Sequence, residues 1–190
     1  MVILGKWQGQ SLTISSKPNS LTVSLDGPTG ARVFSYDLHG RMWTTMLRQV
    51  SYRRGLDGKV VAKWMTADNQ RERRWLAREE SDALLAEACA LLDALCLATE
   101  RGEVELSSPL PPVDLERLRK ATAFSPDVAH ADASRYQTIY RPVGILPPDQ
   151  YMAVVLQLTE GCAFNTCTFC TFYRDRPFRI KKPEEFRQHI

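Results

Sequence analysis

Short runs of strand-forming residues alternate with turn residues over residues 1–65. Three of the turn motifs are Pro18-Asn19-Ser20, Gly27-Pro28-Thr29-Gly30 and Gly55-Leu56-Asp57-Gly58. Strand-forming runs separated by such short turns predict an antiparallel meander, and we expect five strands. Its clearest hairpin joins Val50–Arg53 to Lys59–Trp64, where Asp57-Gly58 is expected to supply the positive φ angles of a tight turn.

Apolar residues at helical spacing follow the meander. Acidic residues near the start and Gly102 beyond the end mark the bounds of an amphipathic helix that should cover one face of the sheet. The apolar positions are Leu84, Ala88, Leu91, Leu92 and Leu95. Cys89 and Cys96 lie on an adjoining stripe, and buried structural thiols explain them better than metal ligands. The preceding segment is ambiguous, because Trp75-Leu76 fits either a last strand or a helix start.

The amino-acid composition changes after residue 102. Seven of the 11 prolines fall between Pro109 and Pro148, and Val113–Ala121 is the one short helical pattern there. We therefore predict three parts, which are an N-terminal α+β leader domain (1–102), a Pro-rich linker (103–150) and a C-terminal part (151–190).

The C-terminal part begins with an apolar run, Tyr151–Leu158, typical of a strand buried on both faces of a parallel sheet. Cys162, Cys167 and Cys170 follow it within nine residues. Thiolates are soft ligands that suit Zn, Cu(I) or iron–sulfur centres, and three of them on one loop leave a ligand position open. A helix is expected to begin at Pro183, and the sequence stops about two turns later, which predicts a truncated chain.

The cysteine spacing, Cys162-x4-Cys167-x2-Cys170 with Phe169 before the last cysteine, resembles the cluster loop of the radical SAM (S-adenosylmethionine) enzymes. The flanking strings Leu158-Thr159-Glu160-Gly161 and Thr171-Phe172-Tyr173 are similar to those of one subgroup. The first gap has four residues, where three is commoner in the family. The upstream segments 36–40 and 52–58 also look similar to leader domains of such enzymes, although a generic hairpin explains them equally well.

The resemblance implies a 4Fe–4S cluster held by Cys162, Cys167 and Cys170, with the fourth iron left for S-adenosylmethionine. It implies that Phe169 lies on the adenine side of that cofactor. For the fold, it implies the first βα unit of a truncated, partial TIM-type barrel. For the reaction, it implies reductive generation of a 5′-deoxyadenosyl radical that acts on an unknown substrate, with an electron donor that reduces the cluster. The chain lacks the Gly-Gly pair that a glycine-rich cofactor strand would carry.

A structural zinc site in a non-enzymatic binding or interaction module is the alternative from another class. Its nearest fourth ligands would be His189 and His130. No catalytic acid or base is assigned from the sequence, because nothing places a histidine or carboxylate against the loop.

The charge of the sequence says little about which partners the protein binds. The net charge is +3, so the sequence neither demands nor excludes nucleic acid. Cationic clusters occur at Arg53-Arg54 and in the tail, and both are more typical of solvated faces than of ligand sites. The tail cluster comprises Arg174, Arg176, Arg179, Lys181 and Lys182. Without a signal peptide or an apolar span, and with an odd number of cysteines, we expect a cytoplasmic protein with no membrane partner.

Overall fold

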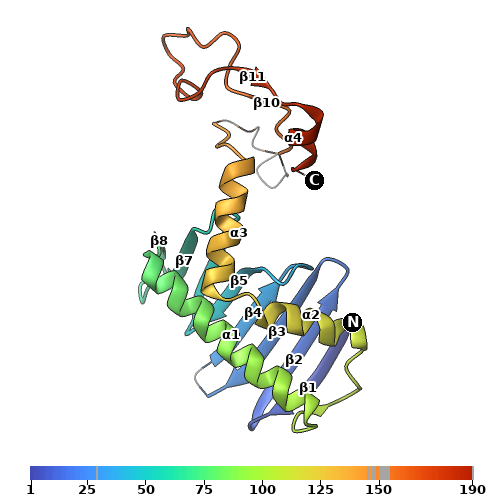
Figure 1. Ribbon diagram of the computed structural model, residues 1–190. Helices are drawn as coiled ribbons and strands as arrows, with labels where there is room; N and C mark the ends of the chain where they lie inside the picture. Colours follow the sequence, from blue (N-terminus) through green and yellow to red (C-terminus); the bar gives the residue numbers. More distant parts are fainter. Residues whose placement is uncertain (29, 145, 147–148, 150–154, 190) are drawn as a thin grey trace. The chain divides into compact units, whose positions relative to one another are not determined.

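The computed structural model describes residues 1–28, 30–144, 146, 149 and 155–189 (Figure 1). The chain forms two compact units, Met1–Ala133 and Ser134–Ile190. The contacts therefore divide the chain within α3. The domain bounds expected from the sequence, after residues 102 and 150, stay a prediction.

Eleven strands and four helices occur in the described residues. The strands are β1 (Val2–Trp7), β2 (Gln10–Lys17), β3 (Ser20–Gly27), β4 (Gly30–Tyr36), β5 (Met42–Leu47), β6 (Val50–Arg54), β7 (Val60–Met65), β8 (Arg71–Trp75), β9 (Glu105–Leu106), β10 (Thr159–Glu160) and β11 (Arg179–Ile180). The helices are α1 (Arg78–Glu100), α2 (Pro112–Thr122), α3 (Pro126–Ile139) and α4 (Pro183–Arg187).

The N-terminal unit is built on one nine-stranded antiparallel sheet with the order β8-β7-β6-β5-β4-β3-β2-β1-β9 (Figure 1). Eight strands follow one another as a meander, and β9 returns to pair with β1. Residues 1–65 hold seven strands, so the expected number of five is wrong. Tight two-residue turns, which the sequence search did not resolve into separate hairpins, account for the difference; β1 and β2, for example, are joined at Gln8-Gly9, both with positive φ.

The hairpin between β6 and β7 is confirmed. The backbone N–H of Gly55 donates to the carbonyl of Lys59 at 2.9 Å, and the Asp57 carboxylate accepts the N–H of Lys59 at 3.2 Å. Of the Asp57-Gly58 pair, only Gly58 has a positive φ, 84°. Strand β6 ends at Arg54 and β7 begins at Val60, so the connection is longer than the expected tight turn.

The predicted fold class is wrong where it places a barrel βα unit after the meander. The described chain is mostly the antiparallel sheet with few helices, and no βα unit of a TIM-type barrel is present in it. Part of the expected strand Tyr151–Leu158, residues 151–154, lies outside the described residues. Residues 155–158 are not a strand, and Leu156 and Leu158 are exposed. An apolar run indicates that a segment prefers burial, but it specifies no pairing partner; of the described residues 155–158, Leu158 accepts a backbone hydrogen bond from Lys181, beside β11.

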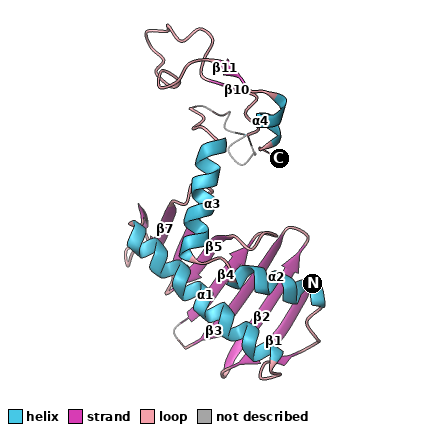
Figure 2. Ribbon diagram, viewed as in Figure 1, coloured by secondary structure: helices cyan, strands magenta, loops and turns pink. Residues whose placement is uncertain are grey.

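Helices α1 and α2 cover the same face of the sheet (Figure 2). This inner face carries every second side chain of the strands, including Leu12, Val23 and Phe34, which are buried. Helix α1 presents Leu92 and Leu95 to it, and neither side chain has exposed surface. The expected amphipathic helix is therefore confirmed, and so is the short helix within 113–121, which is α2.

The two cysteines of α1 lie in or beside this core. Cys96 is buried, and the Cys89 thiol donates to the carbonyl of Phe124 at 3.0 Å. Burial raises the pKa of both thiols, so their thiolate forms are disfavoured. This environment agrees with the structural role expected for them.

Two polar contacts attach the segment after α1 to the sheet. The Ser16 hydroxyl of β2 donates to the buried Asp114 carboxylate of α2 at 2.5 Å. The guanidinium of Arg54 donates to the carbonyl of Ala129 at 3.0 Å and lies 5.0 Å from the ring centre of Phe124. The expectation that Arg53-Arg54 forms a solvated pair is thus wrong for Arg54, because neighbouring residues of a strand point to opposite faces.

Replacement of Leu92 tests the sheet–helix core. We expect Leu92→Ala to lower the free energy of unfolding of the N-terminal unit by about 2–5 kcal/mol, because the substitution leaves a cavity between α1 and the sheet. Urea unfolding followed by tryptophan fluorescence measures it, since all four tryptophans belong to Met1–Ala133. Leu97→Ala on the same helix, where the side chain is 44% exposed, is the control and should change stability by less than about 0.5 kcal/mol.

Candidate metal-binding loop

A two-strand clasp closes the loop that carries the three cysteines. Strands β10 and β11 pair antiparallel, with Thr159 opposite Ile180 and Glu160 opposite Arg179. The backbone N–H of Lys181 extends the pairing by donating to the carbonyl of Leu158 at 3.0 Å. Residues 161–178 therefore form a loop whose two ends are held together, and Cys162, Cys167 and Cys170 all lie within it.

Gly161 is the first residue of this loop, and its position has no room for a side chain. Its φ is 73°, and a Cβ built at this position would meet the carbonyl oxygen of Pro177 at 2.5 Å. The chain turns immediately after β10 and returns close to its own start. The residue before Cys162 is thus fixed by both backbone conformation and space.

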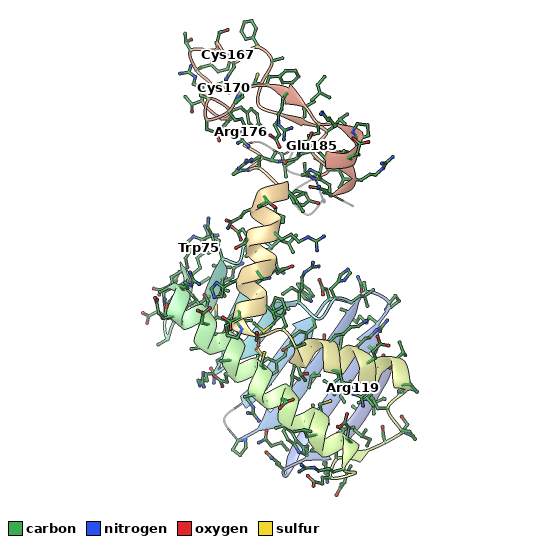
Figure 3. The ribbon with its side chains drawn as sticks, in the orientation of Figure 1. Trp75, Arg119, Cys167, Cys170, Arg176 and Glu185 are labelled. Carbon is green, nitrogen blue, oxygen red and sulfur yellow. The ribbon has the colours of Figure 1, made fainter. Side chains whose placement is uncertain are left out.

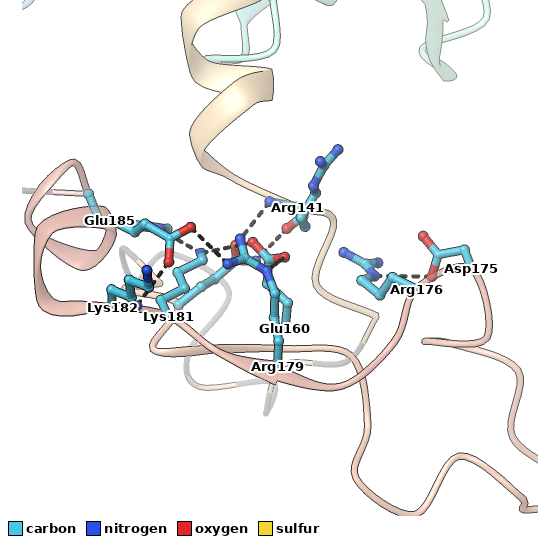
Figure 4. Close-up of polar contacts among 10 residues, drawn as sticks. Arg141, Glu160, Asp175, Arg176, Arg179, Lys181, Lys182 and Glu185 are labelled. Carbon is cyan, nitrogen blue, oxygen red and sulfur yellow. Dashed lines mark hydrogen bonds and ion pairs between the residues drawn. The ribbon is translucent and has the colours of Figure 1, made fainter.

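Charged side chains hold the clasp (Figure 4). Glu160, 10% exposed, lies 2.9 Å from the Arg179 guanidinium and 3.3 Å from the Lys181 ammonium. Arg179 also contacts Glu185 of α4 at 2.8 Å. Burial alone would raise the pKa of Glu160, but the hydrogen bonds from Arg179 and Lys181 outweigh it and lower that pKa. The carboxylate is thus held in its charged form.

His189 packs against the same charged cluster. The Lys181 ammonium and His189 Nε2 are 2.7 Å apart, and both side chains are nearly buried. The Tyr140 hydroxyl donates to the His189 carbonyl at 2.7 Å, and the Tyr140 ring lies edge-on to the imidazole. Burial and the neighbouring Lys181 lower the pKa of His189. Lys181 therefore occupies one ring nitrogen of His189, and the other, Nδ1, is buried without a hydrogen-bond partner among the described residues.

His130, the other expected zinc ligand, belongs to the N-terminal unit. Its Nε2 lies 2.7 Å from the carboxylate of Asp82 on α1. One ring nitrogen of each histidine named from the sequence is thus engaged, by Asp82 for His130 and by Lys181 for His189.

The basic tail is only partly a solvated face, so that expectation is wrong for two of its members. The Lys181 side chain is 3% exposed and the Arg176 side chain 12%. Arg176 donates to the carbonyl of Pro142 at 3.0 Å, and Arg174 donates to the carbonyl of Cys167. Several of the tail cations therefore serve to hold the loop in place.

The three thiols are partly exposed and are not bonded to one another; Figure 3 labels two of them, Cys167 and Cys170. The Cys162 sulfur accepts the backbone N–H of Asn165 at 3.5 Å, and Asn165 has the positive φ of 37° that turns this N–H toward it. Hydrogen bonds from the N–H groups of Asn165 and then Phe164 lower the pKa of Cys162. The first thiol of the loop is thereby favoured as thiolate, the form that binds metal.

The predicted ligands share one loop, but their sulfurs are not gathered at metal-binding distance. Within the described ranges, no three His, Cys, Asp or Glu side chains form a group that could hold a metal ion. The donor set itself fits a thiolate centre, since three accessible thiols lie on one closed loop and one of them accepts backbone N–H groups. Phe169 is 90% exposed and packs against nothing that would fix it.

A pocket of about 360 Å³ adjoins the loop at Gly161. Its lining combines apolar side chains with a few polar groups from residues 141–143, 155–161, Tyr173 and Arg176. Gln157 shapes one wall, because its side-chain amide bonds both the N–H and the carbonyl of Arg141. The sequence did not predict this pocket wall; its one indication was Gln157, a single polar residue within the apolar run.

Comparisons with known proteins found no matching family model, curated protein or solved structure. None of the helices in the described part of the chain is both long enough and apolar enough to cross a membrane.

Removal of the Glu160 carboxylate tests the clasp. Glu160→Gln leaves the buried Lys181 ammonium without its ionic partner, which costs roughly 1–3 kcal/mol. We expect amide hydrogen exchange across residues 159–181 to accelerate by about tenfold, as measured by mass spectrometry on the full chain. Glu184→Gln is the matched control, because the Glu184 side chain is 73% exposed and lies 4.0 Å from Arg187. Equal exchange in both variants would contradict the role assigned to Glu160.

Proposed function

We propose that the loop 161–178 binds a 4Fe–4S cluster through Cys162, Cys167 and Cys170, and that the protein is of the radical SAM type. The observation that carries the proposal is the enclosure of all three thiols in one loop whose ends are fixed by β10 and β11. Three thiolates leave one iron without a protein ligand. Cluster binding requires the loop to draw its three sulfurs together around the metal.

The backbone at the start of the loop supports this assignment. Thiolate ligands of clusters are commonly stabilised by N–H donors, and Cys162 already accepts one from Asn165. The fixed turn at Gly161 holds this donor arrangement next to the clasp. The chain thus contributes one pre-oriented ligand and two that lie on the outer part of the loop.

S-adenosylmethionine is the cofactor that the resemblance proposes for the open iron position. When bound there to a reduced cluster, it supplies a 5′-deoxyadenosyl radical for hydrogen abstraction. The pocket beside Gly161 has the size of a small-molecule site and carries Arg141, Glu160 and Arg176 at its wall. These residues would orient the polar groups of a ligand, and Phe169 would pack on the adenine.

We further propose a reducing, cytoplasmic environment, because thiols that bind a cluster must stay reduced. A protein or small-molecule electron donor would also be required, because the cluster must be reduced before it can pass an electron to S-adenosylmethionine. The substrate is not assigned.

Structural zinc is the second function, favoured by the small, tightly clasped loop. It requires a fourth ligand, and the two histidines named above are engaged by Lys181 and Asp82.

Anaerobic reconstitution with iron and sulfide decides between the two functions. We expect about four irons and four sulfides per chain and a brown chromophore. Cys167→Ala should abolish the chromophore, because two thiolates cannot hold the cluster. Cys89→Ser is the control; it keeps a hydrogen-bond donor toward Phe124 and should bind iron normally. One zinc per chain without sulfide would establish the zinc site instead, and the absence of both would rule out either metal.

Replacement of Phe169 tests the cofactor separately. Because its side chain is 90% exposed, Phe169→Ala should leave folding and iron content unchanged. We expect the affinity of the reconstituted protein for S-adenosylmethionine to fall several-fold through loss of an aromatic contact. Isothermal titration calorimetry measures it. Phe164→Ala, on the same loop and 70% exposed, should bind as the parent does; equal losses in both variants would remove Phe169 from the adenine site.

A further inference from the structure

The outer face of the sheet gathers cations at its β6–β8 end. The strand register places Arg53 opposite Val61, and Val61 opposite Trp75. The next row places Ser51 opposite Lys63, and Lys63 opposite Arg73. A third row pairs Met65 with Arg71. Arg53, Lys63, Arg71 and Arg73 therefore share one face; we call these four residues the basic face.

The basic face has no internal counter-charge. Its four side chains are exposed, and none of them forms an ion pair with any residue in the described ranges. The adjacent Arg74, which points to the opposite face of β8, is paired with Glu80 at 2.6 Å. The carboxylate of Glu72, on the same strand, alternates to the face of Arg74, although it also lines the groove at this end of the sheet. The arginines of β8 thus divide into a paired one and two unpaired ones.

This arrangement is unfavourable for folding by itself. Like charges directly opposite one another on neighbouring strands repel, and Lys63 and Arg73 are such a pair. Arg71 adds a third charge two residues along the same side of β8. Solubility alone does not require three cations in adjoining positions of one register. A polyanionic ligand would convert this repulsion into binding energy.

Apolar surface lies between the cations. Trp75 is 65% exposed at the end of the edge strand (Figure 3), and Met65 is 53% exposed. A groove of about 600 Å³ runs beside Met65. Its lining is Gln49, Ser51, Lys63, Trp64, Met65, Arg71, Glu72 and Arg73. Cations interleaved with an exposed aromatic ring match the pattern that binds both the backbone and the bases of a nucleic acid.

We propose that the basic face is a binding site for single-stranded nucleic acid. Its phosphates would lie along Arg53, Lys63, Arg71 and Arg73, and an unpaired base would stack on Trp75. A duplex hides the faces of its bases from such a ring, so this combination of cations and an exposed aromatic favours a single strand. An anionic membrane is favoured less, because interfacial membrane binding relies on an amphipathic helix with a broad apolar face, and this site lies on strands.

The site is independent of the metal-binding loop. Every residue that forms it belongs to Met1–Ala133, and all three cysteines of the loop belong to the other unit. Failure of cluster reconstitution would therefore leave this proposal intact, and the reverse also holds.

Fluorescence anisotropy with a labelled single-stranded RNA or DNA of about 15 nucleotides, a length within the range of known single-strand sites, tests the proposal on the full chain. Lys63→Gln combined with Arg73→Gln should weaken binding at least tenfold. Each lost phosphate contact should also reduce the slope of log K against log salt by about 0.7, so the double variant should lose about 1.4. The matched control, Arg101→Gln with Lys120→Gln, removes the same net charge from exposed positions away from the face and should bind as the parent does.

Trp75→Ala separates stacking from charge. It should weaken binding at least about fivefold with the salt slope unchanged, because no phosphate contact is removed. Tryptophan fluorescence and size-exclusion chromatography verify that each variant is folded. The proposal is overturned if the parent binds no single strand, or if both double variants bind alike. It is also overturned if duplex DNA or vesicles containing anionic lipid compete as well as the single strand.

Discussion

Burial of one face of a nine-stranded sheet under α1 and α2 is the contact on which the N-terminal unit depends. Within the described residues of Met1–Ala133, the apolar side chains of the inner face are removed from water mainly by these helices, and Phe124 and Ala129 join the same core. Leu92 and Leu95 lie at the centre of that contact. Ser16 and Arg54 add polar contacts that fix how the segment after α1 packs on the sheet: Ser16 bonds Asp114 and Arg117, and Arg54 contacts Ala129 and Asp132.

The sequence predicted the elements whose signals are local. Leucines at helical spacing indicated α1, and turn residues between strand-forming runs indicated the hairpin of β6 and β7. Strand β8 was ambiguous, because all five of its residues are exposed and it therefore carries no alternation of apolar and polar positions. Strand β9 has two residues, and only its pairing with β1 makes it a strand. Helix α3 has one buried residue, so it lacks the apolar stripe from which helices are recognised.

The C-terminal unit shows where a local pattern misleads. The apolar run before the cysteines predicted a strand of a parallel sheet, but such a strand exists only if neighbours pair with it. The cysteines were found by spacing alone. The clasp was not, because the contact of Glu160 with Lys181 joins residues on either side of the loop and depends on burial that no charge count reveals. The charged tail was misread for the same reason: Lys181 and Arg176 point inward.

The two edges of the large sheet differ in how they meet other molecules. One edge ends in β9, whose two residues offer little backbone for pairing, whereas β8 presents five residues with a neighbour on one side only. Such a strand is a template on which a second copy of the chain can add its own β8. Arg71 and Arg73 oppose this by mutual repulsion between copies. A polyanion that neutralises them would therefore do more than occupy the face; it would remove the barrier to edge-to-edge pairing and couple ligand binding to self-association.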